Sequence, residues 1–226
     1  MKLHEKFTRS QKADIIFNEY VQNAIKAYSV DNFAELTPEM RDELFSMRDS
    51  SEKRLKETEK RIKELRRNGN LRDYEGFQVY DLDLEVGELG DKERSLNRQG
   101  VSRLELDSLK ILNLKDHPVL EQLRRGLEMF FLIDPLYRCV SADRLDQVIE
   151  TGFDKPGNTG CFAPYFSKAE NYGGSPPKLV LMYDPNEITY LDGRGEGYEY
   201  QFKKDPKESL LAVLNLRHAK GESNDK

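Results

Sequence analysis

The sequence predicts an α+β fold, in which a helical N-terminal region precedes a mixed β-sheet with short helices. In residues 10–28 apolar side chains recur every three or four positions, which is typical of one face of a helix. Residues 80–86 instead alternate between apolar and acidic side chains, which indicates a half-buried strand. Short apolar runs separated by turn residues fill the C-terminal half. Strands mixed with few, short helices are typical of an α+β domain.

Capping signals predict where the N-terminal helices begin and end. Ser10 is expected to cap the first helix, and Thr37 followed by Pro38 marks a second start. Residues 51–67 form a third helical segment with acidic and basic residues at i, i+4 spacing, and we expect it to end at Asn68. Its apolar stripe is narrow and consists of Leu55, Ile62 and Leu65. We interpret this segment either as an ordinary surface helix or as a seam for a partner.

Later elements are bounded by proline, glycine and the period-two alternation. We expect strands at residues 80–86, 104–114, 136–140, 178–183, 188–191, 198–203 and 209–216. A helix is expected from residue 116 to Asp134, and another is expected after Ser141 as cap, stopping at Gly152. The predicted organisation is a helical region over residues 1–70 that recognises a target or regulates access, a catalytic domain over 71–218 and a disordered polar tail over 219–226.

Composition excludes several classes of protein. The net charge of -5 argues against a general affinity for nucleic acid, although a few local basic residues would suffice to hold a single strand. Two cysteines and three scattered histidines give neither a disulfide framework nor a zinc site, so no metal is expected. The longest apolar run is too short to span a membrane. Without an apolar leader segment, the expected location is the cytoplasm, and delivery into a host cell as an effector stays open.

Arg138 interrupts the apolar strand Leu136-Tyr137-Arg138-Cys139-Val140. A guanidinium in such a strand needs an anionic partner. Its fixed fork of donors suits a phosphate or a ribose, and it suits an internal carboxylate equally well. The local sequence leaves both partners possible.

An aromatic turn follows in residues 157–166, where Gly160 leads into a run with three aromatic side chains, Phe162, Tyr165 and Phe166. Ser167 is expected to cap a short helix after the turn. Exposed aromatics beside a helix start are costly unless they pack against something flat. A nicotinamide ring would serve, and so would a small hydrophobic core.

Glu199 lies in Tyr198-Glu199-Tyr200-Gln201-Phe202. The alternation puts the three aromatic residues on one face of the strand and Glu199 on the other. An isolated glutamate in a strand usually faces solvent. Its position at a strand end, like that of Arg138, is nevertheless where functional sites are commonly built.

Taken in order, these segments resemble the three motifs of the ADP-ribosyltransferase superfamily. Leu136-Tyr137-Arg138 with the helix after it is similar to the first motif in its arginine form. Residues 160–172 are similar to the second motif of the poly(ADP-ribose) polymerase branch. The strand beginning at Tyr198-Glu199 resembles the third motif, which begins with the catalytic glutamate.

The resemblance implies an ADP-ribosyltransferase-like sheet core and NAD as co-substrate. Arg138 would bind the diphosphate or the nicotinamide ribose, and Glu199 would bind the ribose 2'-hydroxyl and stabilise the transition state. The implied catalytic residues are Glu199 and Arg138. The implied NAD-binding residues are Arg138, Ser141, Gly160, Phe162, Tyr165, Phe166, Ser167 and Tyr172.

The function expected from this resemblance is mono-ADP-ribosyl transfer from NAD to a macromolecular acceptor, with a protein as the expected partner and nicotinamide as the released product. Two alternatives stay open. One is an NAD glycohydrolase toxin, in which water is the acceptor. The other is a catalytically inactive relative that acts as an interaction module, docking a partner through Leu55 and Ile62.

Overall fold

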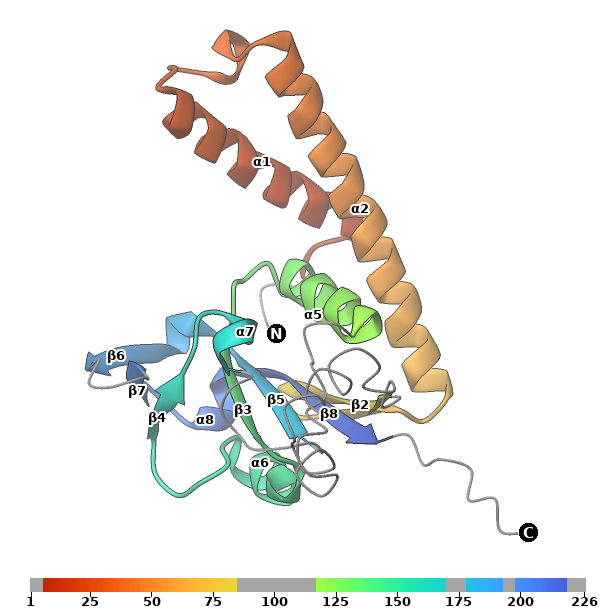
Figure 1. Cartoon of the computed structure of the whole chain (residues 1–226), viewed down its shortest axis with the longest axis vertical. Helices are drawn as coiled ribbons and strands as arrows, with labels where there is room; N and C mark the ends of the chain where they lie inside the picture. The colour runs from red at the N-terminus through yellow and green to blue at the C-terminus, as the bar shows by residue number, and fades with distance from the viewer. Residues whose placement is uncertain (1–5, 85–116, 170–177, 193–197, 219–226) are drawn as a thin grey trace, which may run out of the picture. The chain divides into compact units, whose positions relative to one another are not determined.

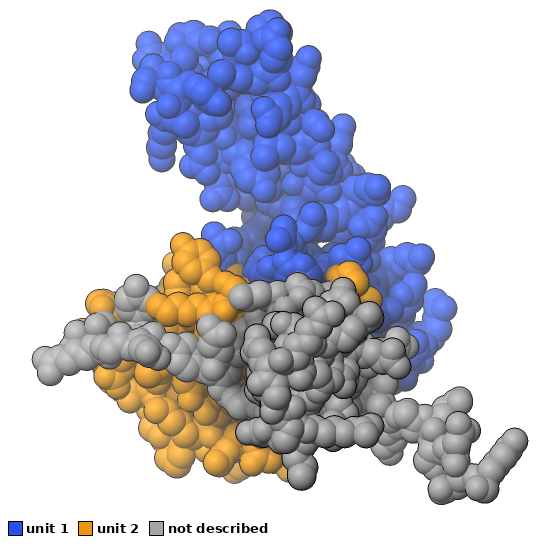
Figure 2. All heavy atoms as spheres, viewed as in Figure 1, with its two compact units in different colours: residues 1–68, 121–134 blue, residues 69–120, 135–226 orange. Residues whose placement is uncertain are grey.

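The structure is a computed structural model that describes residues 6–84, 117–169, 178–192 and 198–218. It has the α+β organisation that the sequence predicts, with helices first and strands after them (Figure 1). The chain packs into two compact units (Figure 2). Unit 1 contains residues 1–68 and 121–134, and unit 2 contains residues 69–120 and 135–226. The segment 121–134 thus packs with the N-terminal helices, whereas the sequence analysis predicted that it belongs to the domain over residues 71–218.

The first helix of unit 1, α1 (Arg9–Tyr28), begins two residues earlier than predicted. Thr8 is the cap, and Ser10 lies inside the first turn. The Thr8 hydroxyl accepts a hydrogen bond from the backbone N–H of Gln11 at 3.3 Å, and the Gln11 side chain accepts one from the backbone N–H of Thr8 at 2.8 Å. This reciprocal capping box satisfies two backbone donors, whereas Ser10 could satisfy one.

The two helical segments predicted after Thr37 are one continuous helix, α2 (Pro38–Arg67). Thr37 caps it as predicted, and it ends at Asn68 as predicted. Ser51 does not start a new helix. Its hydroxyl donates to the carbonyl oxygen of Met47 at 2.8 Å, which satisfies the serine without breaking the helix. A short 3-10 turn, η2 (Phe33–Glu35), lies between α1 and α2.

Helix α5 (Pro118–Phe131) supplies the remaining helix of unit 1. It approaches α2 closely at Gly126, where an added Cβ would lie 1.8 Å from the Thr58 hydroxyl oxygen. Leu55, Ile62 and Leu65 are all buried. The narrow stripe of α2 is therefore covered within the chain, and docking a partner through Leu55 and Ile62 is not supported.

Unit 2 contains a five-stranded sheet of order β1-β2-β8-β5-β3. Its strands are β1 (Leu71–Tyr74), β2 (Phe77–Leu84), β3 (Leu136–Ser141), β5 (Lys178–Tyr183) and β8 (Leu210–His218). β2 and β8 run parallel and the other pairs are antiparallel. The expected strand at 104–114 and the tail at 219–226 lie outside the described residues.

The predicted half-buried strand, β2, is more buried than its alternation suggested. Asp81 is buried as well as Tyr80 and Leu82. Its carboxylate accepts hydrogen bonds from Arg72 at 3.0 and 3.1 Å and from the Asn215 amide at 2.7 Å. Because these partners satisfy the charge, an acidic residue is tolerated inside the unit.

A second, three-stranded antiparallel sheet of unit 2 has the order β4-β7-β6. Its strands are β4 (Thr159–Phe162), β6 (Ile188–Asp192) and β7 (Tyr198–Phe202), and short helices η4 (Ala142–Arg144), α6 (Leu145–Thr151), α7 (Phe166–Ala169), η5 (Pro185–Glu187) and α8 (Pro206–Ser209) connect the strands. The core of unit 2 draws on both sheets, with Leu136, Leu181 and Val213 from the first and Phe162 and Phe202 from the second. Among the described residues, no helix combines the length and apolar character needed to cross a bilayer.

Candidate functional site

The three motif strands, far apart in the sequence, are neighbours in unit 2. β7 pairs with β4, and Ala163, the residue directly after β4, forms an isolated bridge with Tyr137 of β3. The two backbone hydrogen bonds of this bridge measure 2.8 and 2.9 Å. The spatial order β7, β4, β3 therefore puts Glu199, the aromatic turn and Arg138 on adjacent strands.

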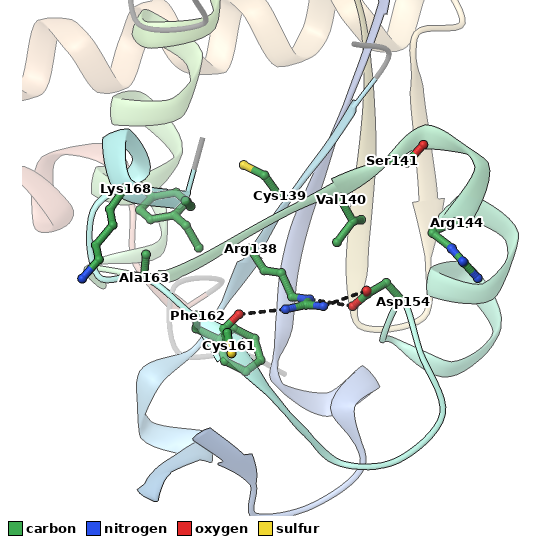
Figure 3. Close-up of a pocket in the computed structure, with 12 residues that line it drawn as sticks. Arg138, Cys139, Val140, Ser141, Arg144, Asp154, Cys161, Phe162, Ala163 and Lys168 are labelled. Carbon is green, nitrogen blue, oxygen red and sulfur yellow. Dashed lines mark hydrogen bonds and ion pairs between the residues drawn. The ribbon is translucent and has the colours of Figure 1, made fainter. Parts of the chain in front are cut away.

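A pocket opens where β3 and β4 separate after this bridge (Figure 3). Its volume is about 390 Å³, which falls within the range of small-molecule sites. β3, β4, α7 and the turn after α6 supply its walls. The lining residues are Tyr137, Arg138, Cys139, Val140, Ser141, Arg144, Asp154, Cys161, Phe162, Ala163, Lys168 and Ala169.

Arg138 spans the gap between the two strands. Its Nη1 donates to the carbonyl oxygen of Cys161 on β4 at 2.9 Å (Figure 3). Its Nε and Nη2 donate to the two carboxylate oxygens of Asp154 at 2.7 and 2.9 Å. Of the two partners that the sequence left possible, the structure thus contains the internal carboxylate. These bonds use three of the five guanidinium N–H groups, so two remain for a further acceptor.

The Arg138–Asp154 ion pair is largely buried. The side chains are 17% and 10% exposed. Burial lowers the pKa of Arg138, but the hydrogen bonds and charge of Asp154 raise it, and the net pKa lies above its ordinary value. The guanidinium is therefore a permanent cation whose charge is already balanced by one carboxylate.

The turn that carries Asp154 is fixed by its surroundings. Gly152 ends α6 in the left-handed region, as predicted, with φ at 74°. The buried hydroxyl of Tyr183 donates to the Gly152 carbonyl oxygen at 2.8 Å, and burial raises the pKa of that tyrosine well above its ordinary value. Phe153 is fully buried against Gly160, where an added Cβ would lie 2.6 Å from its ring. The position of Asp154 is thus set by a packed core.

Two of the aromatic side chains of the turn pack within the protein. Phe162 is buried among Phe153, Tyr183 and Phe202, with ring centroids 5.3 to 6.1 Å apart. Phe166 is buried and contacts Tyr137 edge-on at 5.9 Å. For these two, the structure has the hydrophobic core that the sequence left as an alternative to nicotinamide.

The other residues predicted to bind NAD differ in where they lie. Tyr165 is 69% exposed and does not line the pocket. Ser167 is exposed and lies within α7, which begins at Phe166, so it does not cap that helix. Ser141 does line the pocket, although its side chain does not cap the following turn as expected. Tyr172 lies outside the described residues.

Glu199 lies next to the pocket and not in its wall. It is exposed on β7, directly opposite Cys161, which lines the pocket. Residues directly opposite on antiparallel strands point to the same face, with Cβ atoms about 5 Å apart. The Glu199 carboxylate therefore leaves the sheet on the same face as the Cys161 side chain, one strand from the pocket.

The pocket also contains charged residues that the sequence reasoning missed: Asp154, Arg144 and Lys168. In Figure 3 the two cations lie to either side of Arg138. Among the described residues of the lining, three are cations and one is a carboxylate, so this described part is net positive although the whole chain carries -5. Their positions in the sequence could have pointed to two of them, because Asp154 directly follows the end of a predicted helix and Lys168 lies in the second motif.

Comparison of the chain with family models, with curated proteins and with solved structures gave no match. Within the described ranges, no group of three or more His, Cys, Asp or Glu side chains is arranged to hold a metal ion. The geometry and charge of the pocket are therefore what a functional proposal can rest on.

Proposed function

We propose that unit 2 is an NAD-dependent mono-ADP-ribosyltransferase that breaks the bond between nicotinamide and ribose and transfers ADP-ribose to a protein acceptor. One observation carries the proposal. Three segments that resemble the motifs of that superfamily, separated by up to about sixty residues, occupy neighbouring strands, of which the first two line one pocket and the third pairs with the second. A chance match of short motifs would not by itself bring them together.

The charge of the pocket supports an anionic ligand of nucleotide type. Arg144 lines the pocket beside the balanced Arg138–Asp154 pair, and Lys168 lines it as well. A diphosphate is bound well by such groups, because guanidinium and ammonium donors form charge-assisted hydrogen bonds with phosphate oxygens. A volume of about 390 Å³ favours one half of the dinucleotide in the pocket, with the other half along its opening.

In this proposal Arg138 positions the ligand. Its two remaining N–H groups would donate to ribose or phosphate oxygens while Asp154 and the Cys161 carbonyl hold the guanidinium in place. Because the side chain is already ordered before binding, little further conformational entropy is lost when the ligand arrives.

Glu199 would stabilise the reacting ribose. As the carbon–nitrogen bond breaks, its electron pair leaves with nicotinamide and positive charge develops on the ribose. The acceptor then donates an electron pair to the same carbon and loses a proton. A carboxylate about 4 Å from that charge, at an effective dielectric constant near 20, contributes about 4 kcal/mol. This corresponds to about three decades of rate.

Incubation of the protein with NAD labelled in the adenylate part, alone and with a cell lysate, tests the proposal. We expect nicotinamide release and labelled protein, both reduced roughly a thousandfold by Glu199→Gln. Glu208→Gln is the matched control, because Glu208 is an exposed glutamate elsewhere in unit 2. Equal activity of the Glu199→Gln variant and the wild-type protein refutes the enzyme proposal. Absence of NAD turnover by either protein refutes it as well.

The same experiment separates two other functions. Free ADP-ribose without labelled protein identifies an NAD glycohydrolase. The ion pair between Arg138 and Asp154 favours an inactive interaction module, since the guanidinium charge is already balanced. That function predicts no nicotinamide release even at high protein concentration.

A further inference from the structure

Unit 1 contains a groove between α1, α2 and α5, with a volume of about 680 Å³. All of its lining residues belong to this unit. They are Ile15, Ile16, Glu19, Tyr20, Glu43, Ser46, Met47, Ser50, Ser51, Arg54, Arg125, Glu128, Met129, Leu132, Ile133 and Asp134. Each of the three helices contributes both apolar and charged side chains.

The apolar side chains of the groove are only partly covered by the chain. Ile15 on α1 and Met47 on α2 are 36% and 40% exposed. The other apolar lining residues, Ile16, Tyr20, Met129, Leu132 and Ile133, are partly exposed. Scattered exposed apolar residues are ordinary, whereas a contiguous group in a concave surface indicates an interaction site. Methionines suit such a site because they adapt to different partners.

The end of α5 forms one wall in a strained conformation. Leu132 has a φ of 59°, in the left-handed region that usually holds glycine. Hydrogen bonds from the Leu132 N–H to the Met129 carbonyl and from the Ile133 N–H to the Glu128 carbonyl, each 3.3 Å, hold this turn. A leucine in this conformation is strained because its Cβ crowds the following carbonyl oxygen, and a glycine would avoid the strain. A strained leucine in the groove wall is consistent with a role in binding.

The charge of the groove is negative. Among the described residues, its lining contains four carboxylates, on Glu19, Glu43, Glu128 and Asp134, and two guanidinium groups, on Arg54 and Arg125. The Arg125 guanidinium already contacts Glu121 and the Glu128 carboxylate already contacts Arg124, which leaves three carboxylates and one guanidinium in the described lining. An occupant with apolar side chains on one face and lysine or arginine beside them would complement both properties.

We propose that this groove binds an amphipathic helix of a partner protein, with apolar residues at i, i+3, i+4 and i+7 and basic residues flanking them. A groove between helices accepts a further helix through ordinary side-chain packing. A second copy of the chain is a poorer occupant, because a symmetric contact would bring the acidic rims together. An anionic lipid surface is disfavoured by the same repulsion. The inference does not depend on the proposed enzymatic function.

A designed peptide serves as the probe. It is a fluorescent leucine–lysine amphipathic helix of about 18 residues, or five turns. Fluorescence anisotropy with the full chain should give saturable binding. A peptide of the same composition with its periodicity scrambled should bind at least tenfold more weakly, and so should one with glutamate in place of lysine.

Two substitutions in the groove separate specific binding from general attraction between opposite charges. The double variant Ile15→Asn, Met47→Asn leaves the net charge unchanged and alters exposed side chains, so the fold should persist. It should weaken binding at least tenfold. Tyr28→Asn, which changes a 57% exposed residue outside the groove lining, should not.

Equal binding by the groove variant and the wild-type chain overturns the proposal, and so does equal binding of the scrambled or acidic peptide. Light scattering of the chain alone tests the other occupant. Self-association that the Ile15, Met47 double variant abolishes would assign the groove to a second copy, which also overturns the proposal.

Discussion

Removal of the carboxylate of Asp154 should destabilise unit 2 strongly. Asp154→Ala removes the charged partner of Arg138, whose side chain is only 17% exposed in the intact protein. Breaking a buried ion pair by removing one member costs about 3 to 5 kcal/mol. Because Arg138 keeps its bond to the Cys161 carbonyl and some contact with solvent, we expect a loss of about 3 kcal/mol in the free energy of unfolding, at the lower end of that range.

The measurement is urea unfolding monitored by circular dichroism, because the chain contains eleven tyrosines but no tryptophan whose fluorescence could report unfolding. Asp154→Asn keeps the shape and one oxygen acceptor, so it should cost less than Asp154→Ala. A double variant, Arg138→Met with Asp154→Leu, removes both charges together. Because no buried charge is left unpaired, it should be more stable than Asp154→Ala.

Two results would refute this reasoning. A loss below about 1 kcal/mol in Asp154→Ala would be typical of a solvent-exposed pair. A double variant that is as unstable as the single variant would show that packing of the Asp154 side chain matters, and not the unpaired charge.

Three further predictions concern close backbone contacts and a buried charge. Gly152→Ala should lower the free energy of unfolding by about 3 kcal/mol, because its φ is 74° and the new Cβ would lie 2.3 Å from the backbone of α8. Gly157→Ala is the control, since its φ is 98° but the space around it is open, and it should cost about 1 kcal/mol in the same urea assay. Gly126→Ala should cost about 1 to 3 kcal/mol, and Thr58→Ala should restore part of the loss in a double variant; no restoration would contradict the close approach of α5 to α2. Burial lowers the pKa of Lys12 in the folded chain below its ordinary value of 10.5, so between the folded and unfolded pKa values the unfolded chain binds more protons. The free energy of unfolding of the wild-type chain should therefore rise with pH in that window relative to that of Lys12→Met. A difference between the two proteins that stays constant from about pH 8 to pH 10.5 would contradict this.

The sequence predicted the elements whose signals are local. The proline after Thr37 and the glycine at 152 each act within one turn, and the elements that they predict are confirmed. The alternation that begins at residue 80 correctly predicted a strand, β2, but not how deeply it is buried. Prediction failed where two local signals compete. A separate helical segment was predicted over residues 51–67, but the Ser51 hydroxyl bonds to the preceding turn and α2 continues through it.

The candidate site was predictable only in part, because its contacts join distant segments. An arginine within an apolar strand indicates that the guanidinium has an anionic partner. Nothing in residues 136–140 identifies Asp154 as that partner, because Asp154 lies sixteen positions later, in the turn after α6. Likewise the aromatic spacing of residues 162–166 does not reveal that Phe162 and Phe166 face the core, since burial depends on Phe153 and Tyr137 from other segments.

The discontinuity of unit 1 constrains how this chain can fold during synthesis. The ribosome produces α1 and α2 first, and then more than fifty residues of unit 2, before Gly126 becomes available to meet Thr58. Until then the helical hairpin lacks its third helix. A fragment that stops at Asn68 would stay in that unfinished state, so a faithful dissection of this protein should join α5 to the hairpin through a short linker.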